Sequence, residues 1–134
     1  MASKKAIKGK TEVKTFEPVA YDEPKEGPKL TEVHLTETFT GDIQAESSAR
    51  SLQAQSADGS ASYCGVQRVV GTLDGRRGSF VLQHQGTLQA KQMKTTWFVV
   101  PGSGTGDLRG LRGEGGFEAE LGRHGAWTLD YWFE

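Results

Sequence analysis

The sequence predicts an all-β protein, an eight-stranded antiparallel β-barrel with one short helical turn near Leu108–Leu111. Two observations predict this fold. Apolar and polar residues alternate along successive segments, which is typical of strands with one buried face. Turn sequences such as Ala57-Asp58-Gly59-Ser60 and Asp74-Gly75 separate these segments. Because no long helical pattern interrupts them, the strands favour an antiparallel meander that closes into a small barrel.

The first half of the chain supplies three of the expected strands. Residues 1–8 are lysine-rich and are predicted to form a disordered tail, with a single barrel domain over residues 9–134. A first strand is expected over Gly9–Tyr21, before a loop that contains Pro24, Gly27 and Pro28. A second strand from Leu30 places Val33, Leu35, Glu37 and Phe39 on one face, and a polar third strand covers Ile43–Gln55.

The fourth strand, Ala61–Leu73, is apolar on both faces. Tyr63, Val69 and Leu73 lie on one side, and Cys64, Val66 and Val70 lie on the other. A barrel strand has only an inside and an outside, and this chain has no helix long enough to cover the outside. The pattern therefore predicts a homo-oligomer whose interface covers the outer face.

The second half of the chain supplies the remaining strands. Segments Gly78–Leu88 and Met93–Val100 alternate in the same way, and the second of these is also apolar on both faces. The glycine-rich stretch Pro101–Phe117 is interpreted as an ordered corner anchored by Leu108 and Leu111. The last hairpin is expected from Gly116–Leu121, a turn at Gly122–Gly125, and a closing strand that carries Trp127, Leu129, Tyr131 and Phe133.

Composition excludes several classes of function. Acidic and basic residues are interspersed and the net charge is −1, so neither nucleic acid nor an anionic membrane surface is an expected partner. Cys64 is the only cysteine, which rules out an intramolecular disulfide. With no apolar run of signal-peptide or membrane-spanning length, we expect a cytoplasmic protein.

Three segments resemble an uncharacterised bacterial family, domain of unknown function 3224. They are GSFVLQH at Gly78–His84, VVPGSGTGDLRGLRGEGGFEAE at Val99–Glu120 and YCGVQRVVGTLDGRRG at Tyr63–Gly78. The family is similar in fold to plant allene oxide cyclase, so the resemblance implies an eight-stranded barrel with an apolar cavity, and an oligomer in the better-known relatives. It implies no established activity. The position before Arg68 is commonly glutamate in that family, whereas here it is Gln67, which removes one carboxylate.

Candidate site residues are polar or aromatic side chains on the otherwise apolar strand faces. Glu37 and His84 are the candidate catalytic groups, because a carboxyl group and an imidazole in an apolar barrel have shifted pKa values suited to proton transfer. The candidate ligand-binding groups are Tyr63, Gln67, Trp97 and Tyr131. The three histidines lack the spacing of metal ligands, so neither a metal site nor a cofactor is predicted.

Two interpretations of function remain open at this point. In the first, the barrel binds a small hydrophobic ligand in its cavity, with or without a cofactor-independent cyclase or isomerase activity that works by positioning and exclusion of water. In the second, side chains fill the barrel, which is then a non-catalytic structural or interaction module. An enclosed space faced by Glu37 and His84 would favour the first interpretation.

Overall fold

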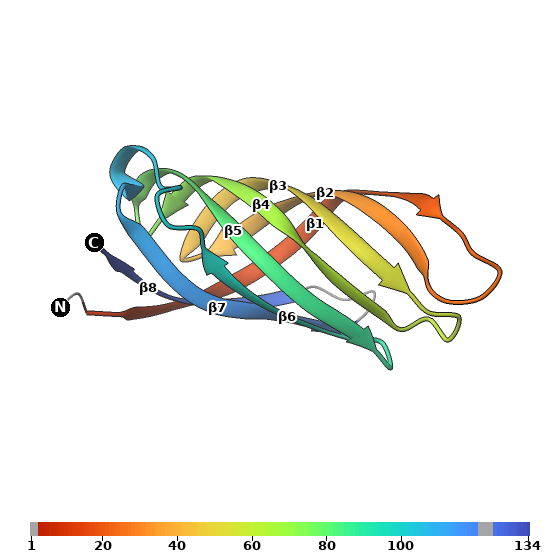
Figure 1. Cartoon of the computed structure of the whole chain (residues 1–134). Coiled ribbons are helices and arrows are strands. Elements are labelled where there is room, and N and C mark those ends of the chain that lie inside the picture. The colour runs from red at the N-terminus through yellow and green to blue at the C-terminus, as the bar shows by residue number, and fades with distance from the viewer. Residues whose placement is uncertain (1–2, 121–124) are drawn as a thin grey trace.

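The computed structural model describes residues 3–120 and 125–134, which form one closed antiparallel barrel in which each strand pairs with the next along the chain and β8 pairs with β1 (Figure 1). The predicted fold class is therefore confirmed. The strands are β1 Lys5–Asp22, β2 Lys29–Gly41, β3 Ile43–Gln55, β4 Ala61–Leu73, β5 Arg76–Gln89, β6 Gln92–Val99, β7 Leu111–Glu120 and β8 Gly125–Phe133, with one 3₁₀ turn, η1, at Gly106–Leu108. Most of the predicted turn at 122–125 falls on residues 121–124, outside the described part of the chain.

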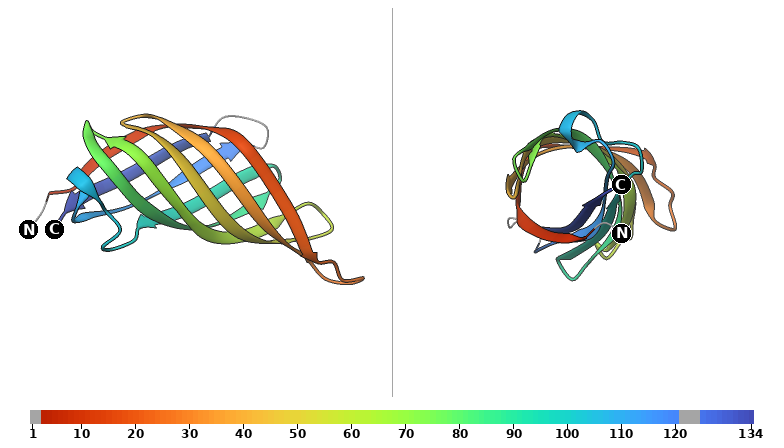
Figure 2. Two further views of the ribbon diagram at one scale, coloured as in Figure 1. Left: turned by 90° about the horizontal axis from the view of Figure 1, so that it is seen from above. Right: turned by 90° about the vertical axis from the view of Figure 1, so that its left-hand side faces the viewer.

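The barrel closes through the first residues of β1. Lys5 to Thr11 pair with Tyr131 to Gly125 of β8, and the view along the barrel shows these strands completing the ring (Figure 2). The prediction that residues 1–8 form a disordered tail is thus wrong for Lys5–Lys8. The sequence suggested a tail because of its lysines, but Ile7 among them is buried in the core, at 3% exposure.

The glycine-rich segment is shorter as a corner than expected, because β7 already begins at Leu111 and the glycines after it lie in this strand. The corner precedes β7 in the chain, and it pairs with β5 beyond the point where β6 ends. The Thr105 backbone N–H donates to the Ser79 carbonyl, and the Ser79 and Val81 N–H groups donate to the hydroxyl oxygens of Thr105 and Ser103. The corner is therefore hydrogen-bonded to β5 at Ser103 and Thr105.

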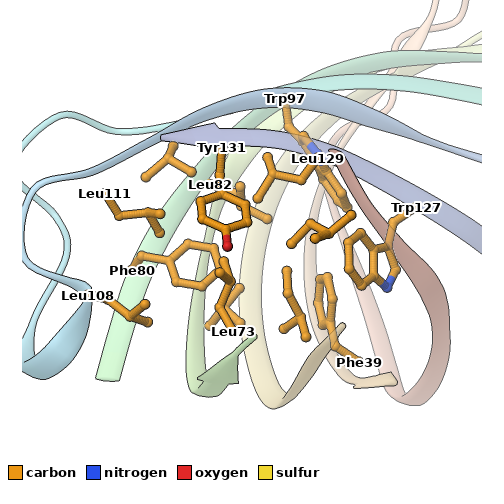
Figure 3. Packing of buried hydrophobic residues seen from close by; sticks show 14 residues of the cluster. Phe39, Leu73, Phe80, Leu82, Trp97, Leu108, Leu111, Trp127, Leu129 and Tyr131 are labelled. Atoms are coloured by element: carbon orange, nitrogen blue, oxygen red, sulfur yellow. The ribbon is translucent and has the colours of Figure 1, made fainter. Parts of the chain in front are cut away.

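Two ends of the barrel can be distinguished. The corner end carries both termini, η1 and the β4–β5 turn, and the hairpin end carries the loops 23–28 and 56–60 (Figure 2). At the corner end the interior is packed with apolar side chains that point toward one another, among them Leu73, Phe80, Leu108 and Leu111 (Figure 3). Leu108 and Leu111 are both buried, as predicted for the anchors of the corner.

Contacts between strands that are not neighbours fill this half of the barrel. The rings of Phe39 on β2 and Trp97 on β6 lie 6.1 Å apart between centroids, and Trp127 on β8 lies 6.0 Å from Phe39. Tyr131 on β8 reaches the β4–β5 turn, where its hydroxyl donates to the Asp74 carboxylate. From the Phe39–Trp97 level to η1, the half of the barrel that we call the corner half is solid.

The outer face of the sheet carries the apolar side chains expected from the sequence. Val66, Val70 and Phe98 point outward and are 49%, 54% and 42% exposed. The predicted assignment of strand faces is therefore confirmed for β4 and β6. Within the described residues, no helix is long and apolar enough to cross a membrane.

Candidate functional site

The half of the barrel between the Phe39–Trp97 level and the hairpin end, here called the hairpin half, differs from the solid corner half. On β4, β5 and β6 its inward-pointing side chains alternate with exposed ones, whereas every residue of β1 from Glu12 to Asp22 is exposed. Several of the inward-pointing side chains are only partly buried. A side chain that faces the inside of a closed sheet meets solvent only through the lumen or its mouth. The partly buried inward-pointing residues are Leu35, Ser51, Tyr63, His84 and Phe117.

A buried polar cluster lies next to the aromatic layer in the hairpin half. The Gln67 side-chain amide donates to Glu37 Oε1 at 2.9 Å and to Ser47 Oγ at 2.8 Å. The Ser47 hydroxyl in turn donates to the Glu37 carbonyl at 3.1 Å, so it must accept from Gln67, which fixes the orientation of the amide. Both amide hydrogens of Gln67 are therefore used within the cluster.

Burial is the main influence on the charge of Glu37. Removal of the carboxylate from water raises the pKa of Glu37, and hydrogen bonds from Gln67 and Thr11 act in the opposite direction by stabilising the charged form. The net effect is a raised pKa. A carboxyl group in this environment accepts and releases a proton closer to neutral pH than an exposed glutamate does.

His84 lies on β5, facing the lumen beside Ser51 of β3. The Ser51 hydroxyl donates to the Cys64 carbonyl at 3.1 Å, so its contact with His84 Nε2, at 3.3 Å, requires the imidazole to donate. Burial lowers the pKa of His84, which keeps the ring neutral at neutral pH. The proton of the neutral ring is thereby assigned to Nε2, and Nδ1 carries a lone pair.

Tyr63 lies across a glycine of the neighbouring strand. It is paired in register with Gly86, and a Cβ at Gly86 would lie 2.6 Å from the tyrosine hydroxyl oxygen. Only glycine leaves room for this ring, whose hydroxyl reaches Thr95 Oγ1 on β6 at 2.7 Å. The ring of His84 lies beside it, with centroids 6.2 Å apart.

Two acceptor atoms in the lumen have no partner among the described residues, Gln67 Oε1 and His84 Nδ1. Within the described chain, every fully buried side-chain nitrogen and oxygen has a hydrogen-bond partner. These two atoms are therefore in contact with accessible space. The lumen of the hairpin half thus presents hydrogen-bond acceptors on a wall of mixed polar and apolar side chains.

The structure brings together five of the six predicted site residues. Glu37, Gln67, Tyr63 and His84 face the hairpin half, and Trp97 forms its floor with a ring nitrogen that donates to the Thr128 carbonyl. Tyr131 does not join them, because it lies in the corner half with its hydroxyl held by Asp74.

Four further polar residues of this site were not singled out from the sequence: Thr11, Ser47, Ser51 and Thr95. The sequence indicates these residues only as small polar side chains at inward-pointing positions of strands in which inward and outward residues alternate. The sequence pattern did not show which of them would face Glu37 or His84. Across residues 3–120 and 125–134, no three histidine, cysteine or acidic side chains are arranged to hold a metal ion.

Comparison with known proteins places the chain in a family. A search of curated proteins finds no match. A crystal structure of a protein with unknown function from the DUF3224 family of Shewanella oneidensis MR-1 superimposes with a TM-score of 0.85, at 38% sequence identity, covering 98% of each chain. The family model described as "Protein of unknown function (DUF3224)" matches residues 7–131. The chain therefore belongs to the DUF3224 family.

Proposed function

We propose that the hairpin half of the barrel binds a small, mostly apolar molecule that carries a hydrogen-bond donor such as a hydroxyl group. The observation that supports this is the pair of unpartnered acceptors, Gln67 Oε1 and His84 Nδ1, in a lumen that also carries the apolar side chains of Leu35, Trp97 and Phe117. Unpaired polar atoms beside an apolar surface favour a ligand that satisfies both at once.

The same groups suit a cofactor-independent isomerisation or cyclisation as the reaction of such a site. Neutral His84 has a lone pair at Nδ1 that can take a proton from a bound molecule and return it at another atom. Glu37, with its raised pKa, is a second group able to exchange a proton in the lumen. A reaction of this kind needs no group beyond the side chains of the barrel and the substrate.

A side-chain-filled structural module is the second candidate, and the corner half favours it. There the Phe39–Trp97 contact and the Tyr131–Asp74 hydrogen bond cross the barrel, and buried apolar side chains pack between the strands. If the hairpin half were filled in the same way, no ligand would enter. The two candidate functions therefore differ in whether free space lies beside Leu35 in the lumen.

The binding test uses two probes of nearly equal size, 2-naphthol and 2-methoxynaphthalene, followed by NMR titration. We expect saturable binding of 2-naphthol, with shifts at Gln67 and His84, and weaker binding of the ether because it lacks the donor. Leu35→Trp should block the lumen and weaken 2-naphthol binding at least about tenfold, equivalent to roughly 1.4 kcal/mol. Leu52→Trp, on the outer face of the adjacent strand, is the matched control and should bind like the wild type.

Leu35→Trp also distinguishes the candidates when no probe binds. In a lumen with free space, the larger ring is accommodated with little loss of stability. In a filled barrel, it overpacks the interior and lowers the free energy of unfolding by about 1–3 kcal/mol. Absence of binding together with such a loss would establish the filled module. Turnover of an unsaturated epoxide that is lost in His84→Gln, with binding retained, would establish an enzyme.

A further inference from the structure

One row of outward-pointing side chains crosses six strands of the barrel in register. Pairing places Arg50 beside Val66, Val66 beside Gln83, Gln83 beside Phe98, and Phe98 beside Glu114. Asp130 of β8 continues the row next to Glu114. All six of these side chains are exposed. The row thus runs from a cation, through Gln83 flanked by Val66 and Phe98, to two carboxylates.

This row is complementary to itself under a twofold rotation. A twofold axis that lies between the two copies and runs parallel to β5 at Gln83 exchanges the positions on its two sides, so Val66 of one copy faces Phe98 of the other. The same rotation brings Arg50 of each copy over Glu114 of the other. Isologous contacts of a dimer require this relation, in which one patch carries both halves of each interacting pair.

The surface at this row is suited to receive a second copy. It forms a shallow hollow of about 760 Å³ whose lining includes Val66, Gln83, Phe98, Glu114 and Asp130. The barrel curves away from Gln83 on both sides, so contact at the rim requires long side chains, and arginine and glutamate supply them. Within a single copy, Glu114 and Arg50 form the exposed ion pairs Lys4–Glu114 at 3.1 Å and Arg50–Glu32 at 3.9 Å. These pairs contribute little stability.

We propose that the protein forms a twofold-symmetric homodimer through the outer face of β4, β5 and β6, with Val66–Phe98 contacts at its centre and Arg50–Glu114 ion pairs at its rim. The exposed apolar side chains of β4 and β6 are then covered by the same face of a second copy. This interface is on the outside of the sheet and does not depend on ligand binding in the lumen.

Charge reversal tests the pairing directly. Arg50→Glu or Glu114→Arg places like charges opposite each other twice per dimer, so each should weaken dimerisation by at least about tenfold in sedimentation equilibrium. The double variant restores both pairs with reversed sign and should dimerise like the wild type. Arg109→Glu, an exposed reversal in the corner, is the matched control and should have no effect. A wild-type monomer throughout a micromolar concentration series, or a dimer indifferent to both reversals, would overturn the proposal.

Cross-linking tests the position of the axis. In a Cys64→Ser background, Gln83→Cys places two thiols opposite each other across facing sheets, which lie about 10 Å apart. A short bismaleimide should link them into a covalent dimer. Glu12→Cys, on β1 at the other side of the barrel, should stay unlinked. Equal linking of the two variants would show that the copies do not meet at Gln83.

Discussion

Glu37 shows how a single residue's environment decides its chemistry. Its carboxyl group is buried, but the Gln67 amide and the Thr11 hydroxyl offset part of the cost of its negative charge. Ser47 completes the cluster by fixing which way the amide of Gln67 points. The charge of Glu37 is therefore coupled to the stability of the barrel.

Glu37→Gln should change how stability depends on pH. Because the pKa of Glu37 is raised above 4.5, the folded protein retains a proton that the unfolded chain has already released. The wild type's stability relative to Glu37→Gln is thus fully present below about pH 4.5 and is lost as pH rises through the raised pKa. Urea unfolding of both proteins at acid and at mildly alkaline pH measures this difference.

Glu12→Gln provides the matched control, since it removes one carboxylate from the exposed side of β1 and leaves the interior unchanged. Parallel pH profiles of the wild type and Glu37→Gln would contradict the effect of burial at Glu37. They would also remove the basis for treating this carboxyl group as a proton-exchanging group of the lumen.

The corner between β6 and β7 shows that the order of a single element depends on its contacts with neighbouring elements. Its glycines predict an ordered segment with tight turns, and three of them, Gly102, Gly106 and Gly110, have positive φ. Its order also comes from hydrogen bonds to β5, which the spacing of glycines does not reveal. Gly104 has an ordinary φ and is required for a different reason, since a Cβ there would lie 1.9 Å from the Leu108 carbonyl oxygen.

Gly104→Ala should therefore destabilise the protein by about 1–3 kcal/mol, because the carbonyl it meets belongs to a residue anchored in the core. Gly102→Asn is the comparison: Gly102 has a φ of +80° with open space around it, and asparagine tolerates this conformation. Its effect should stay within about 0.5 kcal/mol. Thermal unfolding of the two variants measures both. Equal stabilities would mean that the corner moves away from Leu108 at little cost.

At the scale of the whole molecule, closure of the barrel depends on its first strand. Lys5 to Thr11 supply the ladder to β8, and Ile7 contributes to the core. Without this segment the sheet would have two open edges and an uncovered interior. The lysine-rich start of the chain is therefore part of the fold.

Removal of residues 2–9 should abolish cooperative unfolding, because it deletes Ile7 and most of the ladder between β1 and β8. Removal of residues 2–4 is the matched control. It deletes Lys4, with its exposed ion pair to Glu114 and its exposed cation–π contact with Trp132, which contribute little. Circular dichroism melting curves measure both. Closely similar curves for the two truncations would mean that the barrel closes without β1 residues 5–9.

The features that repeat locally along the chain can be predicted from the amino-acid sequence alone. Alternation placed Glu37, Gln67 and His84 inside and Val66 and Phe98 outside, because successive side chains of a strand point to opposite faces. It also determined the number of strands and most of their bounds. The alternation does not identify Lys5–Lys8 as part of a strand, because a single buried isoleucine among lysines carries too little periodic signal.

Which of the inward-pointing residues meet depends on how the strands are arranged in the folded barrel. The Gln67–Glu37 hydrogen bond joins β4 to β2, and the Phe39–Trp97 contact crosses the lumen between strands four apart. Alternation fixes the face of the sheet on which a side chain lies. Whether two side chains lie at the same level along the barrel depends on the register and tilt of every strand between them. For this reason Tyr131, which the sequence pattern groups with the other candidates, lies in the solid half, away from the candidate site.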